Sequence, residues 1–110
     1  MTAVRATISK FLDESFPGWV ECWFEDSQGR AWTFHEKVPV LTADDLWVDS
    51  EYPRPCAIAC MILEHKSDSV GRRIAVIDTS SPWGIESTEG TTVFEVFSEQ
   101  LEGGNAETDL

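Results

Sequence analysis

The chain has 110 residues, an apolar fraction of 42%, five tryptophans and a formal net charge of −12 at pH 7. This length suits a single domain with its own core, and the aromatic content excludes a disordered chain, because such chains have too little apolar surface to bury. The negative charge excludes nucleic acid and anionic membranes as partners and favours a basic protein.

The first half of the chain predicts β-strands, because apolar side chains recur at every second position. Residues 4–12 predict a half-buried strand with an irregular end, and residues 16–18, Phe-Pro-Gly, predict a turn. Residues 19–26 and 30–38 then predict an antiparallel hairpin. Its turn has Asp first and Gly fourth, which suits a type I turn.

The middle of the chain predicts one helical turn and one buried strand. Residues 42–47 begin with Thr42, which caps helices well, and carry Asp45 at the position of a reciprocal cap. Residues 56–65 are apolar at nearly every position, which is typical of a strand covered on both faces.

The last third predicts a further strand and a second hairpin. Residues 73–78 fit a strand, and residues 83–87 and 91–97 flank a short turn. Residues 92–101 also fit one face of a helix, but their β-branched and aromatic side chains favour a strand. We therefore expect a strand to about Phe97, followed by at most one turn of helix.

The predicted fold class is all-β, or β-rich with one or two short helical turns. Six to seven short strands separated by turns indicate a small antiparallel barrel or a two-layer sandwich. We expect residues 1–101 to form a single β domain. Residues 102–110 have no periodic apolar pattern, so we expect a disordered tail there.

The expected cellular location follows from what the sequence lacks. No apolar run approaches the roughly 18 residues that cross a bilayer, and the first residues lack the charged start and apolar core of a secretory signal. We therefore expect a cytoplasmic protein. The three cysteines, Cys22, Cys56 and Cys60, lie among apolar neighbours, so we expect them to be reduced and buried.

No motif in the sequence indicates a cofactor or a metal. The chain contains no phosphate-binding glycine loop, dinucleotide fingerprint or paired zinc ligands. Cys56 and Cys60 would lie about 13 Å apart on a strand, which is too far for one zinc ion. We therefore expect neither a cofactor nor a metal.

The histidines keep a small hydrolase open as an alternative. His35, with Glu36 beside it, could act as a general base. Its nucleophile would have to be one of many serines, and no glycine-flanked elbow marks one. His65 adjoins a polar loop, which is typical of a surface histidine.

Acidic and aromatic residues are the strongest candidates for a partner-binding surface. The predicted hairpin places two tryptophans on the same strand face as two glutamates, so that aromatic anchors adjoin charges that select arginine or lysine. A second acidic patch lies within residues 44–51, where the acids also fit helix capping, solvation or cation binding. The predicted contact residues are Trp19, Glu21, Trp23, Glu25, Asp44, Asp45 and Glu51.

Three segments carry a resemblance to known proteins: residues 36–40 (EKVPV), 52–55 (YPRP) and 82–87 (PWGIES). They resemble segments of a family of small, acidic, uncharacterised bacterial proteins, and the resemblance covers most of residues 4–101. It implies no particular activity. In size and charge the chain is also similar to bacterial immunity proteins, which neutralise basic toxin domains by covering them.

The sequence favours a non-enzymatic acidic module that binds a basic protein, most concretely an inhibitor similar to immunity proteins or antitoxins. One alternative is a β-barrel whose tryptophan-lined mouth binds a small molecule or a carbohydrate. The other is a small hydrolase that uses His35. An acidic plane would favour the first, a single concave aromatic pocket the second, and a serine, a cysteine or several carboxylates beside His35 the third.

Overall fold

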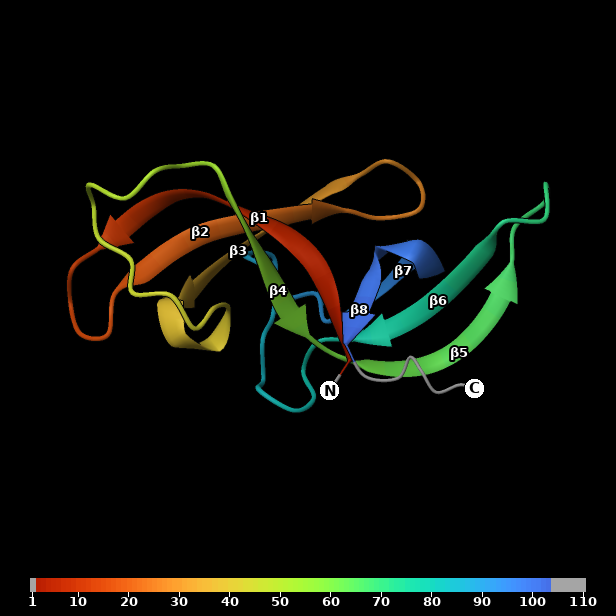
Figure 1. The fold of residues 1–110 in the computed structure, drawn as a ribbon. Helices are drawn as coiled ribbons and strands as arrows, with labels where there is room; N and C mark the ends of the chain where they lie inside the picture. The colour runs from red at the N-terminus through yellow and green to blue at the C-terminus, as the bar shows by residue number, and fades with distance from the viewer. Residues whose placement is uncertain (1, 104–110) are drawn as a thin grey trace.

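Two antiparallel sheets make up the described part of the chain, residues 2–103, in a computed structural model with eight strands (Figure 1). The first sheet has the order β3-β2-β1-β4, with β8 also pairing with β1, and the second has the order β5-β6-β7. Short 3-10 turns, η1 and η2, follow β3 and β7. The bounds are β1 (Thr2–Asp13), β2 (Trp19–Glu25), β3 (Ala31–Lys37), η1 (Val38–Val40), β4 (Arg54–Ala59), β5 (Met61–Ser67), β6 (Arg73–Asp78), β7 (Val93–Phe97), η2 (Ser98–Gln100) and β8 (Leu101–Gly103).

The all-β prediction is confirmed, and the arrangement of the two sheets fits the two-layer sandwich. The strands of the described residues do not close into a barrel, and they number eight rather than six or seven. Within residues 2–103, no helix has the length and apolar character that crossing a membrane requires.

β1 is the central strand of the first sheet. Along one edge it pairs with β2 through residues 7–13 and with β8 through residues 2–4, and along the other edge it pairs with β4. Its register with β2 shifts after Ile8 and again after Phe11, which agrees with the irregular strand end predicted from the sequence. Val4 and Ile8 are fully buried, as the alternating pattern predicts.

The first predicted hairpin is confirmed as β2 and β3. The two strands pair in register along their whole length, with Cys22 opposite Phe34 at the centre. In the turn between them, Gly29 has a φ of 84° and donates its N–H to the carbonyl of Asp26 at 3.0 Å. A glycine at this position adopts the left-handed backbone without steric strain, so the sequence signal for the turn has a direct physical cause.

The strand predicted over residues 56–65 is in fact two strands. The chain leaves the first sheet at Cys60, whose N–H donates to the carbonyl of Thr2 at 3.0 Å, and continues as β5 in the second sheet. The prediction of cover on both faces fails beyond Cys60, because Met61 and Leu63 are 49% and 50% exposed. β5 is an edge strand of its sheet, so part of its apolar run meets solvent.

The second predicted hairpin is wrong in its first strand. Residues 83–87 form a turn and irregular backbone, and only β7, from Val93, is a strand. Hydrogen bonds of the buried Thr79 hold this segment where the sequence predicted pairing between two strands. The Thr79 hydroxyl donates to the carbonyl of Ile85 at 2.7 Å, and its N–H donates to the carbonyl of Thr92 at 2.8 Å. Hydroxyl side chains offer the backbone such alternatives to a sheet, so the segment fills the core without pairing.

The predicted helical turn over residues 42–47 is also wrong. The 3-10 turn η1 lies before it, and the Thr42 hydroxyl accepts the N–H of Asp44 at 3.1 Å without starting a helix. In a helix the N–H of Trp47 would bond to the carbonyl four residues back, but here it donates to the Ser50 hydroxyl at 2.9 Å. A side chain has again replaced a backbone partner.

The C-terminal prediction is confirmed, with a strand as far as Phe97 and one helical turn after it. In η2 the Gln100 side chain accepts the N–H of Phe97 at 2.8 Å. Glu102 and Gly103, which we expected in the tail, pair with β1 as part of β8. The rest of the predicted tail, residues 104–110, lies outside the described residues.

Phe94 of β7 joins the two sheets. Its ring packs at an angle against Phe24 and Phe34 of the first hairpin, at centroid distances of 5.2 and 5.8 Å, and against Trp32 at 5.1 Å. Such edge-to-face packing adds to the stabilisation that burial provides. Phe94 is 3% exposed, so nearly all of its apolar surface is removed from water.

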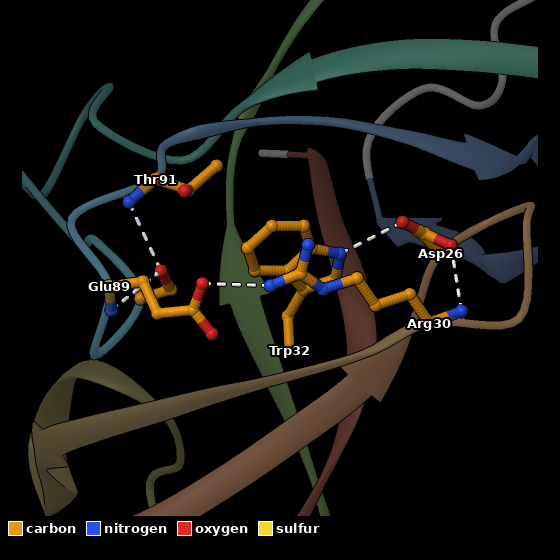
Figure 2. A network of polar contacts seen from close by, with 6 residues as sticks. Asp26, Arg30, Trp32, Glu89 and Thr91 are labelled. Atoms are coloured by element: carbon orange, nitrogen blue, oxygen red, sulfur yellow. Dashed lines mark hydrogen bonds and ion pairs between the residues drawn. The ribbon is translucent and has the colours of Figure 1, made fainter.

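A polar clamp fastens the first hairpin to the segment before β7 (Figure 2). The Arg30 guanidinium stacks on the Trp32 ring at 3.8 Å and pairs with the Glu89 carboxylate at 2.7 Å. Asp26 accepts the Trp32 indole N–H at 2.9 Å and the Arg30 backbone N–H at 3.0 Å. β3 is an edge strand of the first sheet, and the N–H of Thr88 donates to one of its carbonyls. The free edge of β3 is therefore partly covered.

Phe94→Ala is expected to lower the free energy of unfolding by about 3–5 kcal/mol, because it removes a ring that both sheets share and leaves a cavity. Urea unfolding followed by circular dichroism measures the change. Val93→Ala is the matched control: Val93 is 49% exposed on the same strand, and its loss should cost less than about 1 kcal/mol. Equal losses in the two variants would contradict the central role of the Phe94 ring.

Candidate functional site

Figure 1 shows the β1–β2 turn and the segment that follows β3 at one end of the molecule. Residues of these two segments line a groove of about 810 Å³. Residues 14–18 of that turn line one side, and residues 38–49 line the other, with gaps. The N–H of Val38 donates to the carbonyl of Gly18 at 3.0 Å, which fastens the two sides to each other. The groove is therefore built by two segments that are distant in sequence.

The floor of the groove is apolar, and three large apolar side chains beside it are exposed. Val38 and Leu46 are buried and belong to the core. Phe16 is 96% exposed, Trp47 66% and Val48 56%. Single exposed apolar residues are ordinary on protein surfaces, but three at one concave site are typical of a contact surface.

The loop that carries Trp47 is held in place by its own hydrogen bonds. The carbonyl of Trp47 accepts the N–H of Ser50 at 3.1 Å and the hydroxyl of Tyr52 at 2.6 Å. The neighbouring Leu46 is 5% exposed and anchors the loop in the core. Trp47 is therefore presented to solvent by a braced segment.

Four exposed carboxylates surround these apolar side chains. Glu14 lies on the β1–β2 turn, and Asp44, Asp45 and Asp49 lie on the loop. Arg54 pairs with Asp44 at 3.0 Å, and these four acids form no other ion pair within residues 2–103. The rim therefore carries a net negative charge, which attracts cationic groups.

Two of the predicted contact residues, Asp44 and Asp45, line this groove. Glu51 is exposed on the same loop, two positions after the lining residue Asp49. The other four predicted residues lie on β2, so the structure divides the predicted set between two surfaces.

The β2 residues of the predicted set differ in exposure. Trp23 is 36% exposed, and Glu25 is exposed. Trp19 is half-buried, with the Lys37 ammonium 5.4 Å from its ring centroid. Glu21 is half-buried as well. This face therefore offers less exposed aromatic surface than the groove.

His35 and Ser9 both contact the carboxylate of Glu21. The His35 Nε2 is 3.4 Å from Oε2 of Glu21, and Ser9 donates its hydroxyl to Oε1 of the same carboxylate at 2.8 Å. The Ser9 hydrogen bond is the largest cause that lowers the pKa of Glu21, so the carboxylate stays charged. A serine hydrolase needs the imidazole to take the serine proton, and among residues 2–103 no hydrogen bond joins Ser9 directly to His35.

All three cysteines are buried and free, as predicted. A hydrogen bond with Cys56, and then burial, raises the pKa of the Cys22 thiol, and burial raises the pKa of Cys60 to about 11. Thiols of this kind stay protonated at neutral pH and are weak nucleophiles. Across the described range 2–103, no three His, Cys, Asp or Glu side chains are grouped so that they could hold a metal ion.

The sequence prediction missed the apolar part of the groove, which is made by Phe16, Trp47 and Val48. The sequence pattern places Phe16 in a turn and Trp47 at the end of a helical turn. One signal could have found them: each is a large apolar side chain within a polar turn or loop, where burial in the core is not expected.

Comparisons with protein-family models, with curated proteins and with solved structures found no match to this chain. The resemblance to small acidic bacterial proteins stays a prediction from three short segments. The function therefore has to be inferred from the site itself.

Glu36 is a half-buried carboxylate near the end of β3. It lies on the same strand face as Phe34, and burial raises its pKa above the ordinary value of 4.5, with the Glu86 carboxylate acting in the same direction. The folded protein therefore holds the Glu36 proton more tightly than the unfolded chain does. It follows that this group's contribution to stability falls as the pH rises through the raised pKa.

Glu36→Gln is expected to raise the free energy of unfolding at pH 7, because the amide places no charge in a half-buried position. The gain should shrink as the pH falls and vanish well below pH 4.5, where Glu36 is protonated in both states. Urea unfolding at several pH values measures the difference, with the exposed Glu64→Gln as the control. A gain that is the same at every pH would contradict an origin in charge.

Proposed function

We propose that the chain is a non-enzymatic, cytoplasmic interaction module that binds a basic protein through the groove between the β1–β2 turn and the loop after η1. One observation carries the proposal: the most exposed aromatic side chains, Phe16 and Trp47, lie in the same concave site as four carboxylates. Trp is prominent among binding hot spots, and clustered acids select arginine and lysine.

The two kinds of group would act at different stages of binding. The net charge of −12 and the acidic rim attract a basic protein over a distance of about one Debye length, roughly 8 Å at physiological salt. The exposed rings and Val48 then lose their contact with water when the partner is in place. The charge thus raises the association rate, and the apolar contact lowers the dissociation rate.

The more specific form of this proposal is an inhibitor similar to bacterial immunity proteins, with a basic toxin domain as the partner. Its support is the size and charge of the chain together with a groove that combines acids and aromatic anchors. An inhibitor of this kind needs no catalytic group of its own, because it acts by covering the partner.

The second candidate is a small-molecule binder, favoured by the volume of the groove. About 810 Å³ falls within the range of small-ligand pockets, roughly 300–1,000 Å³. The sequence suggested a barrel mouth lined by several tryptophans as the binding site of such a ligand. The groove is open instead, and its lining includes one tryptophan, Trp47. Because acids surround it, the ligand in this case would be a cation and not a neutral carbohydrate.

Asp45→Lys combined with Asp49→Lys is expected to slow association with the basic partner by about tenfold or more at low salt, because both charges lie on the groove rim. Basic proteins retained from a host extract by the immobilised chain provide the partner, and stopped-flow mixing measures its association rate. The difference between variant and wild type should diminish as salt is added, since salt screens exposed charges.

Glu64→Lys combined with Glu99→Lys is the matched control, because it makes the same change in net charge at exposed acids outside the groove. Equal slowing in both double variants would mean that net charge, not the groove, attracts the partner. If association is slowed only by the double variant Glu21→Lys with Glu25→Lys, the contact surface lies on β2 and not at the groove. Failure to retain any basic protein would contradict the proposal itself.

A further inference from the structure

We propose that the groove receives a short protruding segment of the partner in which one apolar side chain is flanked on both sides by arginine or lysine. This inference rests on the proposed function, because it takes the partner to be a basic protein. It adds what that partner must present: an apolar anchor between two cationic groups, carried on a loop or a chain end.

The apolar anchor follows from the composition of the site. The lining combines the buried Val38 and Leu46 with the exposed Phe16, Trp47 and Val48, so much of the groove presents apolar surface. A ligand with charges alone would leave that surface in water or would bring a desolvated cation against it, which is unfavourable. An aliphatic side chain at this point removes apolar surface from water on both partners.

The flanking cations follow from the positions of the acids. Glu14 lies on the β1–β2 turn, whereas Asp45 and Asp49 lie on the facing loop, so negative charge is present on both sides of the apolar centre. Asp44 is already paired with the Arg54 guanidinium at 3.0 Å. This internal pair shows that an arginine side chain fits beside the rim, and it leaves the other three acids to a ligand.

A protruding segment follows from the shape of the site. The lining of this concave site includes the buried Val38 and Leu46, and the exposed Phe16 and Trp47 come from its two segments. A flat protein surface would not follow a concave lining down to its buried residues. A loop or a chain end can enter the groove, as extended and helical peptides do in other apolar grooves.

Three synthetic peptides with blocked ends test the proposal. The first has a central leucine with two arginines on each side, the second has glycine in place of leucine, and the third has glutamates in place of the arginines. Titrations are followed by NMR of the five tryptophan indole N–H signals, with the Trp47 signal assigned from Trp47→Phe. The leucine–arginine peptide should bind and shift the Trp47 signal, and the glycine peptide should bind about tenfold more weakly or worse.

Protein variants test the same contact from the other side. Trp47→Ala should weaken binding of the leucine–arginine peptide by about tenfold, because the loss of the ring removes apolar contact area. Trp83→Ala is the matched control, since Trp83 is 56% exposed but lies outside the groove. Both side chains are exposed, so neither variant is expected to unfold.

The outcomes separate this inference from the function on which it rests. Equal binding of the leucine and glycine peptides, equal binding of the acidic peptide, or a shift confined to Trp23 would overturn the inference. The inference would also be overturned if a basic partner needs Asp45 and Asp49 for binding but none of the peptides binds. In that case the proposed function would still stand. If no basic protein is retained and no peptide binds, both proposals fail together.

Discussion

The contact between Phe94 and the first hairpin is the constraint on which the rest of the structure depends. The chain itself links the two sheets at Cys60 and through β8, which returns to pair with β1. These links attach both edge strands of the second sheet, β5 and β7, to the first sheet, and the ring of Phe94 adds a packing contact with Phe24 and Phe34. The salt bridge between Arg30 and Glu89 adds a second link between the first hairpin and the segment before β7.

The candidate site lies away from this junction, at the opposite end of the long dimension from the β5–β6 turn (Figure 1). Residues of the sheets supply most of the core, and the connecting segments supply the exposed rings and acids of the groove. Loops on a rigid scaffold commonly carry binding groups, because they can vary while the elements that position them stay fixed. The hydrogen bond between Val38 and Gly18 ties these two segments to one another.

Alternation of apolar residues predicted β1, β2 and β3 well, because half-buried strands expose one face and bury the other. The prediction failed where a side chain replaced a backbone partner, as the hydroxyls of Thr79 and Ser50 do. Such hydrogen bonds depend on where distant residues arrive, and local sequence carries little information about that. The candidate groove could be predicted only in part for the same reason: Asp44 and Asp45 stand out as charges in the sequence, whereas Phe16 and Trp47 come to line one groove only through the fold.

Leu46 and Trp47 are adjacent in the chain, yet one is a core residue and the other faces solvent. Phe16 and Trp47 both lie outside the core cluster of the described residues. Their identities are therefore weakly coupled to folding, and substitutions there are expected to cost little stability. Under the proposed function, selection on such a chain would replace one partner by another within an unchanged scaffold, and related chains should diverge first at the groove and last around Phe94.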